Sequence, residues 1–344
     1  MYSLILDNIQ YMITKERFLS LIQGLQTYFS DSSNKDKIEL FVDKAKNENA
    51  WFSDYLIRNA MKAIDQQFFN VAIWDSFFEK QDAFSSTPKL VGLILSGNLP
   101  AVGMHDLLMT LAAGHLAVLK LSSQDKAMMQ LYIEAIQSID AEFSIEVVER
   151  LPSVDAVIAT GSDFSSSYFS NYFAKIPHII RKNRSSVAVL TGNETSLDFE
   201  GLAVDIFTYY GLGCRNVSSI MVPKDYDLIP LFDVLTQVDW VLEHTKYSNN
   251  YQYHKTLLLL NQIPHYDLGN VIVTENEALV SPVGVLHVHR YASEEELRTW
   301  LKQHEAKIQC VVGQQTIHFG QAQMPALDDF ADGVNTYEFL VNLS

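Results

Sequence analysis

The stretch that decides the fold is residues 90–123, LVGLILSGNLPAVGMHDLLMTLAAGHLAVLKLSS. Its apolar run Leu90–Leu95 ends in a polar turn, a helical stretch covers about residues 103–113, and a second apolar run covers Leu116–Leu121. Gly114 can close that helix, because glycine tolerates the left-handed backbone found after a helix end. Strand, polar turn, helix and strand in this order predict a parallel sheet with crossover helices.

The same alternation continues towards the C-terminus. A helix is predicted from about Asp125 to Ile139, and three short apolar runs predict further strands, at Ile145–Val148, Ala156–Ala159 and His178–Ile180. Ligands on parallel sheets bind beyond the carboxyl ends of the strands. The polar strand ends expected to meet a ligand are Ser96–Asn98, Lys120–Ser123 and Thr160–Ser162.

A second α/β unit is predicted after these strands. Its expected strands are Val187–Leu190, Ser218–Val222, Val271–Val273, Val285–Val288 and Ile308–Val312, with helices at Leu197–Tyr210, Asp227–Leu242, Tyr247–Leu260 and Ser293–His304. The basic polar stretch at residues 181–186 lies between the two units. We therefore expect one domain over residues 1–184 and a second over 185–320, with 321–344 unassigned. Residues 1–87 are expected to be mostly helical, including an amphipathic helix within 49–73 that serves as a packing layer.

Composition excludes several classes of protein. A chain of 344 residues suits about two domains of roughly 150 residues each. Its net charge of -16 repels phosphate backbones and anionic lipid, so neither nucleic acid nor a membrane surface is an expected partner. Two cysteines fit a reducing compartment. The N-terminus lacks the basic flank of a signal peptide, and polar residues interrupt the most apolar region, so we expect a soluble cytoplasmic protein with no membrane span.

Several common chemical motifs are missing. The sequence contains no P-loop, no G-x-S-x-G elbow and no H-E-x-x-H pair. His287 and His289 alternate on one predicted strand without a third ligand at metal spacing, so no metal site is predicted. Residues 211–213, Gly-Leu-Gly, lack the third glycine of a dinucleotide fingerprint and lie before a strand, the reverse of the order that phosphate binding requires.

The two cysteines differ in their surroundings. Cys310 lies inside an apolar strand and is interpreted as a core residue. Cys214 lies between a predicted helix and a strand, among Gly213, Arg215 and Asn216. A neighbouring cation favours the thiolate form, which is the nucleophilic form. The residues alone leave two interpretations of Cys214 open, a catalytic nucleophile and a buried structural thiol.

Four motifs together resemble the aldehyde dehydrogenase superfamily in their order and spacing: Gly97-Asn98-Leu99-Pro100, Lys120-Leu121-Ser122-Ser123, Thr160-Gly161-Ser162 and the loop Gly211–Asn216. Ser96–Asp106, Tyr209–Asn216 and His244–Tyr253 are similar to the acyl-CoA reductase branch in particular, the LuxC-like fatty-acid reductases. The resemblance implies an α/β fold of two doubly wound domains with the active site between them. It assigns the cofactor to the domain within 1–184 and the nucleophile to the domain within 185–320.

The resemblance also implies residue roles. Cys214 would be the nucleophile, and the side-chain amide of Asn98 with the backbone N–H of Cys214 would form the oxyanion hole. Lys120 would hold the adenine-side ribose, while Gly161 and Ser162 would approach the pyrophosphate. The cofactor-contact candidates are Ser96, Gly97, Lys120, Ser122, Ser123, Thr160, Gly161 and Ser162. Each motif also has an ordinary structural interpretation, since Asn is common in turns and Thr and Ser cap helices.

Two departures from the family pattern bear on the reaction. Hydrolytic aldehyde dehydrogenases carry a Glu-Leu-Gly-Gly stretch whose Glu activates water, whereas residues 180–185 contain no carboxylate here. A thioester intermediate that must await hydride is endangered by an activated water, so the absence favours acyl reduction over aldehyde oxidation. Ser123 stands where an acid often grips both ribose hydroxyls. Without that carboxylate a 2′-phosphate is tolerated, so NADPH is the expected cofactor and NADH an alternative.

The sequence therefore predicts an NAD(P)H-dependent reductase that converts an acyl-CoA, or another acyl thioester, to an aldehyde through an acyl-cysteine. Two alternatives remain open at this point, an acyl-phosphate reductase of the same superfamily and a non-catalytic nucleotide-binding relative. A homo-oligomer is compatible with the resemblance. The sequence does not indicate acyl chain length, nor a role for residues 1–87 or for His244–Tyr253.

Overall fold

The computed structural model describes residues 13–81, 87–161 and 163–343. The chain divides into two compact units. Unit 1 contains the described residues up to Lys182 together with those from Ala326 onward, and unit 2 is Asn183–Pro325. The C-terminal segment that the sequence left unassigned thus belongs to unit 1 from Ala326.

Unit 1 begins with a layer of helices. Local capping residues set their starts: Thr14 caps α2, Ser53 caps α4 and Asn70 caps α5 through side-chain oxygens that accept backbone N–H groups. The amphipathic helix expected within residues 49–73 is α4, which ends at Phe68, and a second helix starts after the cap residue Asn70. The helices are α2 (Lys15–Ser30), α3 (Lys35–Glu48), α4 (Asp54–Phe68) and α5 (Val71–Glu79), with a 3₁₀ turn at Ser32–Asn34.

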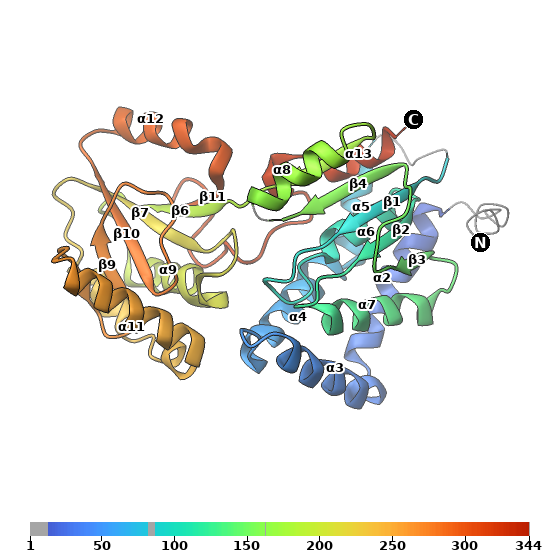
Figure 1. Ribbon diagram of the computed structural model, residues 1–344, viewed down its shortest axis with the longest axis horizontal. Coiled ribbons are helices and arrows are strands. Elements are labelled where there is room, and N and C mark those ends of the chain that lie inside the picture. The colour runs from blue at the N-terminus through green and yellow to red at the C-terminus, as the bar shows by residue number, and fades with distance from the viewer. Residues whose placement is uncertain (1–12, 82–86, 162, 344) are drawn as a thin grey trace. The chain divides into compact units, whose positions relative to one another are not determined.

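The sheet of unit 1 is wholly parallel and has the strand order β3-β2-β1-β4-β5. Its strands are β1 (Leu90–Ile94), β2 (Leu116–Lys120), β3 (Ile145–Val147), β4 (Ala156–Thr160) and β5 (His178–Arg181). The helices α6 (Met104–Ala112), α7 (Lys126–Ile139) and α8 (Asp163–Tyr172) connect them, and Figure 1 shows α7 and α8 on opposite sides of the sheet. This is the doubly wound arrangement expected from the sequence.

A buried ion pair ties the C-terminal segment to this sheet. Arg181 at the end of β5 donates to Asp106 Oδ2 at 3.0 Å, its other terminal nitrogen lies 2.7 Å from Oδ1, and it also donates to Thr336 Oγ1 at 2.8 Å. Burial acts to raise the pKa of Asp106, but the charge of Arg181 and contacts from His105 outweigh it and hold that pKa below its ordinary value. Thr336 begins α13 (Thr336–Val341), which packs on α6.

Unit 2 is a six-stranded sheet of order β11-β6-β7-β10-β9-β8. It is parallel except for the short edge strand β8, which no sequence pattern indicated. In Figure 1, α12 lies on one side of the sheet, and α9 and α11 lie on the other. The strands are β6 (Ser185–Val189), β7 (Val217–Pro223), β8 (Tyr266–Asp267), β9 (Ile272–Glu275), β10 (Val285–Tyr291) and β11 (Ile308–Val312), and the helices are α9 (Ser196–Phe207), α10 (Ile229–Leu235), α11 (Thr245–Leu260) and α12 (Glu294–His304).

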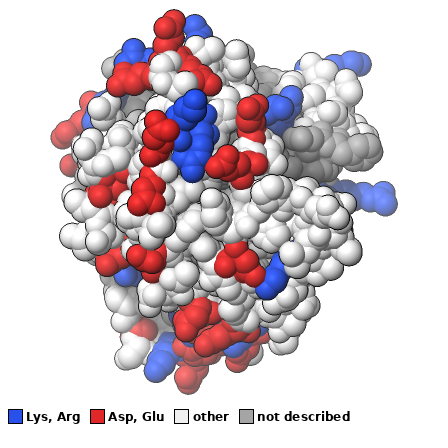
Figure 2. All heavy atoms as spheres, turned by 90° about the vertical axis from the view of Figure 1, so that its left-hand side faces the viewer, with Lys and Arg blue, Asp and Glu red and all other residues white. Residues whose placement is uncertain are grey.

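Two surface properties accompany this fold. Among the described residues, every helix is too short or too polar to cross a bilayer. Figure 2 shows carboxylate side chains spread over one face of the molecule, with Lys and Arg interspersed between them. The described residues of that face present no continuous basic surface for a polyanion.

Candidate active site

Cys214 occupies an exposed position in the loop before β7, while Cys310 is buried in β11. The predicted helix 197–210 ends earlier, at Phe207, because Tyr209 and Tyr210 adopt left-handed backbone angles with φ of 61° and 55°. Gly211 follows with φ of 77°. Non-glycine residues rarely adopt such angles unless the surrounding structure enforces them, and they concentrate at functional sites. The chain therefore makes a tight, strained turn immediately before the cysteine.

Asn216 is the residue that holds this turn. Its side chain is 2% exposed and accepts the N–H of Gly213 at 2.9 Å. Its amide nitrogen donates towards the carbonyl oxygens of Asp205 at 3.2 Å and Ile206 at 3.3 Å, and also to that of Thr208. The carbonyls of Asp205 and Ile206 belong to the last turn of α9 and that of Thr208 to its C-cap, where carbonyl groups lack partners within the helix. One amide thus closes the helix and fixes the loop two residues beyond Cys214.

A buried carboxyl group supports the other side of the loop. Asp205 is 0% exposed and accepts the N–H groups of Gly320 at 2.7 Å and Ala322 at 2.9 Å. Arg215, next to the cysteine, donates to the carbonyl oxygen of Ala322. Burial raises the pKa of Asp205 to about 6, against the opposing effects of the two amides and of Arg215. The segment around residue 320 and the cysteine loop are therefore coupled through one titratable group.

A serine hydroxyl also links the two cysteines. Ser186 Oγ on β6 donates to the carbonyl oxygen of Cys214 at 2.9 Å and lies 3.0 Å from Cys310 Sγ. The backbone N–H of Cys310 donates to Ser186 Oγ at 3.2 Å. Cys310 is 7% exposed, as expected of a core residue. Sequence reasoning did not single out Asp205 or Ser186, because their side-chain partners lie far away along the chain. It noted Asn216 only as a polar neighbour, because no sequence pattern marks the contacts of an Asn side chain with the turn before it.

In unit 1 the three polar strand ends lie side by side. β1 pairs with both β2 and β4, all parallel, so the segments after Ile94, Lys120 and Thr160 emerge at one edge of the sheet. The approach of the first two is tight, because a Cβ on Gly97 would lie 2.4 Å from Ser122 Oγ. Gly97 is therefore a position at which only glycine fits without displacing its neighbour.

The candidate cofactor residues differ in accessibility. Asn98, Lys120 and Ser123 are exposed, whereas Ser96, Ser122, Thr160 and Gly161 are partly covered and Gly97 is buried. The Ser122 hydroxyl accepts the N–H of Gln124 at 3.2 Å, so it also caps its own turn. The backbone N–H of Gly161 lies 3.4 Å from the carbonyl oxygen of Arg181. Ser162 falls outside the described residues.

The segment His244–Tyr253, which resembles the acyl-CoA reductase branch, forms the first part of α11. The ring of His244 lies 4.3 Å from that of Tyr210 and accepts the N–H of Tyr247, capping the helix. Tyr247 is buried and donates its hydroxyl to the carbonyl oxygen of Asn270 at 2.8 Å. The motif thus packs against the left-handed tyrosine turn that precedes Cys214, which gives it a structural role.

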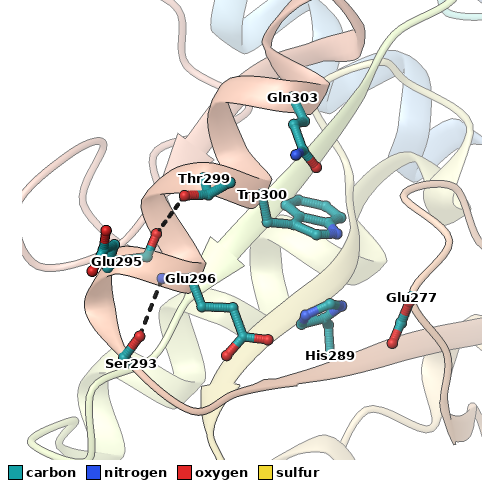
Figure 3. A pocket seen from close by; sticks show the side chains of 8 residues that line it. All are labelled: Glu277, His289, Ser293, Glu295, Glu296, Thr299, Trp300 and Gln303. Atoms are coloured by element: carbon teal, nitrogen blue, oxygen red, sulfur yellow. Dashed lines mark hydrogen bonds between the residues drawn. The ribbon is translucent and has the colours of Figure 1, made fainter.

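A separate cavity of about 430 Å³ lies on unit 2, between the end of β10 and α12. Figure 3 shows His289 between the carboxyl groups of Glu277 and Glu296, with the ring of Trp300 nearby. None of the sequence-predicted site residues lines it. His287, the other histidine of β10, directs Nδ1 at the carbonyl oxygen of Ala278, 2.8 Å away. Within the described ranges, no group of three or more His, Cys, Asp or Glu is arranged to hold a metal ion.

Comparison with known proteins identifies the family. A sequence profile described as acyl-CoA reductase (LuxC) matches residues 16–234, more than half of the chain. The chain belongs to the acyl-CoA reductase (LuxC) family. As a member of this family, the chain is an oxidoreductase. The match begins at residue 16 and so includes the N-terminal helices, whereas the motifs that carry the sequence resemblance begin at Ser96. A search of curated proteins returned no match.

Solved structures establish the fold of this acyl-CoA reductase family member. An aldehyde dehydrogenase from Mycobacterium tuberculosis in complex with NAD+ superposes with a TM-score of 0.63 at 14% identity, covering 91% of this chain and 77% of that one. A mutant of aldehyde dehydrogenase C from Pseudomonas syringae, with NAD+ and octanal, gives 0.62 at 13% identity, covering 88% and 73%. The NAD+ complex of an enzyme from Bacillus cereus gives 0.61 at 14%, covering 88% and 72%. The α/β aldehyde dehydrogenase fold predicted from the sequence is confirmed.

Proposed function

We propose that this protein reduces an acyl thioester, with acyl-CoA as the donor, to an aldehyde through a covalent intermediate on Cys214. The observation that supports this most is the exposed cysteine on a strained loop that Asn216 clamps, in a chain of the acyl-CoA reductase family. A nucleophile needs an accessible sulfur held in one place, and this loop provides both. A structural thiol would be buried, as Cys310 is.

In the proposed first step, the Cys214 thiolate attacks the thioester carbonyl carbon. The carbonyl oxygen gains the charge, and the Asn98 amide with the Cys214 N–H stabilises it. The oxyanion then collapses, the bond from carbon to the CoA sulfur breaks, and CoA leaves as a thiolate that takes up a proton. The product is an acyl-cysteine thioester on the chain.

Reduced nicotinamide, when bound, would supply the hydride that turns this thioester into the alkoxide of a hemithioacetal. The alkoxide then re-forms a carbonyl group, the carbon–sulfur bond to Cys214 breaks, the aldehyde leaves, and the Cys214 thiolate is restored. The residues of unit 1 fit such a cofactor. Exposed Lys120 and Ser123 lie at the carboxyl edge of the parallel sheet, and Gly161 lies two residues before Asp163, the first residue of α8, where a pyrophosphate is favoured.

The absence of a water-activating carboxylate supports reduction over oxidation. In the family pattern, the base is expected within the stretch that corresponds to residues 180–185. The first charged residue of this stretch is Arg181, and it forms a buried ion pair with Asp106. We expect a side chain so held to take no part in activating water. Because the relatives of the fold bind NAD+ while Ser123 leaves room for a 2′-phosphate, we propose NADPH as the preferred cofactor, with NADH accepted. We also propose a cytoplasmic location.

Covalent labelling tests the nucleophile directly. The protein is incubated with an acyl-CoA in the absence of cofactor, digested and analysed by mass spectrometry. We expect the acyl group on the peptide that contains Cys214, free CoA in equal amount, and aldehyde only after NADPH is added. Cys214→Ser should form no aldehyde, whereas Cys310→Ala should retain it. A fully active Cys214→Ser variant would refute the mechanism.

The same assay separates the remaining candidate reactions. An acyl phosphate offered in place of acyl-CoA should acylate Cys214 more slowly, if the thioester is the natural donor. Faster acylation by the phosphate would instead identify an acyl-phosphate reductase. No adduct from either donor, with nucleotide binding retained, would identify a non-catalytic relative.

A further inference from the structure

The loop that carries Asn98 is held at both ends by side chains from outside it. At one end, the amide nitrogen of Asn49 donates to the carbonyl oxygen of Gly97 at 3.1 Å, across 48 residues of sequence. At the other end, the carboxyl oxygen Oδ2 of Asp125 accepts the N–H of Ala101 at 2.8 Å. Asn98 itself is exposed between these two anchors.

The first anchor comes from the N-terminal helical layer, for which the sequence analysis indicated no role. Asn49 follows α3 and is 6% exposed. Its Oδ1 accepts the N–H of Trp51 at 2.9 Å, so both ends of its amide are engaged and its orientation is fixed. A buried, doubly bonded amide is a rigid support, and it contacts the residue directly before Asn98.

The second anchor is an exchanged helix cap. Asp125 stands at the N-cap of α7 but makes no side-chain bond to that helix, and its carboxyl group is directed at Ala101 instead. The helix N–H of Ala127 is accepted by Glu48 Oε2 from α3 at 2.8 Å. The side chain of an N-cap residue normally accepts a backbone N–H group of its own helix and stabilises that helix. The diversion of Asp125 indicates that its carboxyl group serves the Asn98 loop.

The loop would not hold its shape without support. Ala101 has a left-handed backbone with φ of 52°, a conformation that is unfavourable for a non-glycine residue. Gly97 lies so close to Ser122 that it has no room to shift in that direction. Asp125 is 1% exposed, and its Oδ1 has no hydrogen-bond partner among the described residues. Burial, with a contribution from Glu48, raises the pKa of Asp125 well above its ordinary value, against the effect of the Ala101 amide.

We propose that Asn49 and Asp125 are positioning residues that aim the amide of Asn98 at the developing oxyanion. The inference rests on the proposed function, in which Asn98 stabilises that charge. It assigns the N-terminal helical layer a part in catalysis, through Glu48 at the end of α3 and Asn49 directly after it. It also explains why the N–H of Ala127 in α7 is accepted by Glu48 and not by the cap residue Asp125.

The test compares two reactions of the same sulfur. Acylation of Cys214 by acyl-CoA passes through an oxyanion, whereas alkylation by iodoacetamide does not. Asn49→Ala should slow acylation by about 10- to 100-fold, as expected for a misplaced catalytic group, and leave alkylation unchanged. Asn34→Ala is the matched control, because Asn34 also donates to a backbone carbonyl in the helical layer, that of Tyr28, yet touches no site residue.

A double-mutant cycle shows whether the effect acts through Asn98. In an Asn98→Ala background, Asn49→Ala should cause little further loss of acylation rate, because the group that it positions is gone. Asp125→Ala should behave like Asn49→Ala, and Asp125→Asn should restore acylation, since its amide oxygen can still accept the Ala101 N–H. Circular dichroism melting confirms that each variant is folded.

The outcomes are distinguishable from failure of the proposed function. If the wild-type protein acquires no acyl group on Cys214, the proposed function is wrong. If it does, and Asn49→Ala acylates at the wild-type rate, or loses the same factor in the Asn98→Ala background, the positioning role is wrong. Equal losses in acylation and alkylation would show a general disturbance of the fold and would also overturn it.

Discussion

Replacing Asn216 with alanine should both destabilise the protein and misplace its cysteine. The side chain accepts one hydrogen bond, from Gly213 at 2.9 Å, and its two amide hydrogens are shared among three carbonyl oxygens, those of Asp205, Ile206 and Thr208. Three net hydrogen bonds at about 1 kcal/mol each give a loss of about 3 kcal/mol in the free energy of unfolding. Because these carbonyls lie at the end of α9 and directly after it, the loss concentrates at the turn before Cys214.

Asn216→Asp sharpens the test. The aspartate keeps an acceptor for Gly213 but directs a carboxylate at three carbonyl oxygens, so it should resist ionisation and hold a raised pKa in the folded state. The destabilisation that ionisation of this carboxyl group causes is then absent below the ordinary carboxyl pKa and grows as pH rises through the raised pKa. Asn216→Ala lacks that pH dependence, and the two variants should diverge towards neutral pH.

Urea unfolding followed by circular dichroism gives the free energies, and the rate of Cys214 alkylation by iodoacetamide reports the loop. Asn193→Ala on the same unit is the control, since Asn193 is exposed and its loss should change stability by less than about 0.5 kcal/mol. If Asn216→Ala matches that control in stability and alkylates at the wild-type rate, the assignment of Asn216 as the clamp of the loop is refuted.

Three further outcomes are expected. Ser123→Glu should weaken NADPH relative to NADH by about fivefold, the effect of about 1 kcal/mol of like-charge repulsion, and an unchanged ratio of dissociation constants would disprove the placement of the ribose. Arg181→Met should lower the free energy of unfolding by about 3–5 kcal/mol in urea titrations, because it leaves the Asp106 carboxylate buried without its partner. In the wild type, the ion pair stabilises the fold at neutral pH, and this stabilisation is lost as pH falls through the lowered pKa of Asp106. The wild type should lose stability as pH rises from 3.8, the ordinary pKa of an Asp carboxyl group, to about 6, the raised pKa of Asp205, and Asp205→Asn should lack this loss. Parallel curves of unfolding free energy against pH for the two proteins across that range would contradict the raised pKa.

The sequence by itself determined the elements and the local motifs. Apolar runs followed by polar turns located β1, β2 and β4, since a buried parallel strand must be apolar along its length and must end where ligands are met. The position of Cys214, between a helix and a strand among small and polar residues, was also visible in the chain. These are properties of neighbouring residues, and neighbouring residues are what a sequence pattern reports.

Only the tertiary structure decided how these pieces are supported. Asn49 meets Gly97 across 48 residues, and Arg181 meets Thr336 across 155 residues; no periodicity marks either contact. The helix that was expected to reach Tyr210 ends at Phe207, where the backbone turns left-handed, and Asn216, nine residues further along, donates to the carbonyl oxygens of that turn and of the helix end. Such contacts depend on where folding brings each side chain, because a hydrogen bond requires two groups within about 3 Å regardless of their separation in the chain.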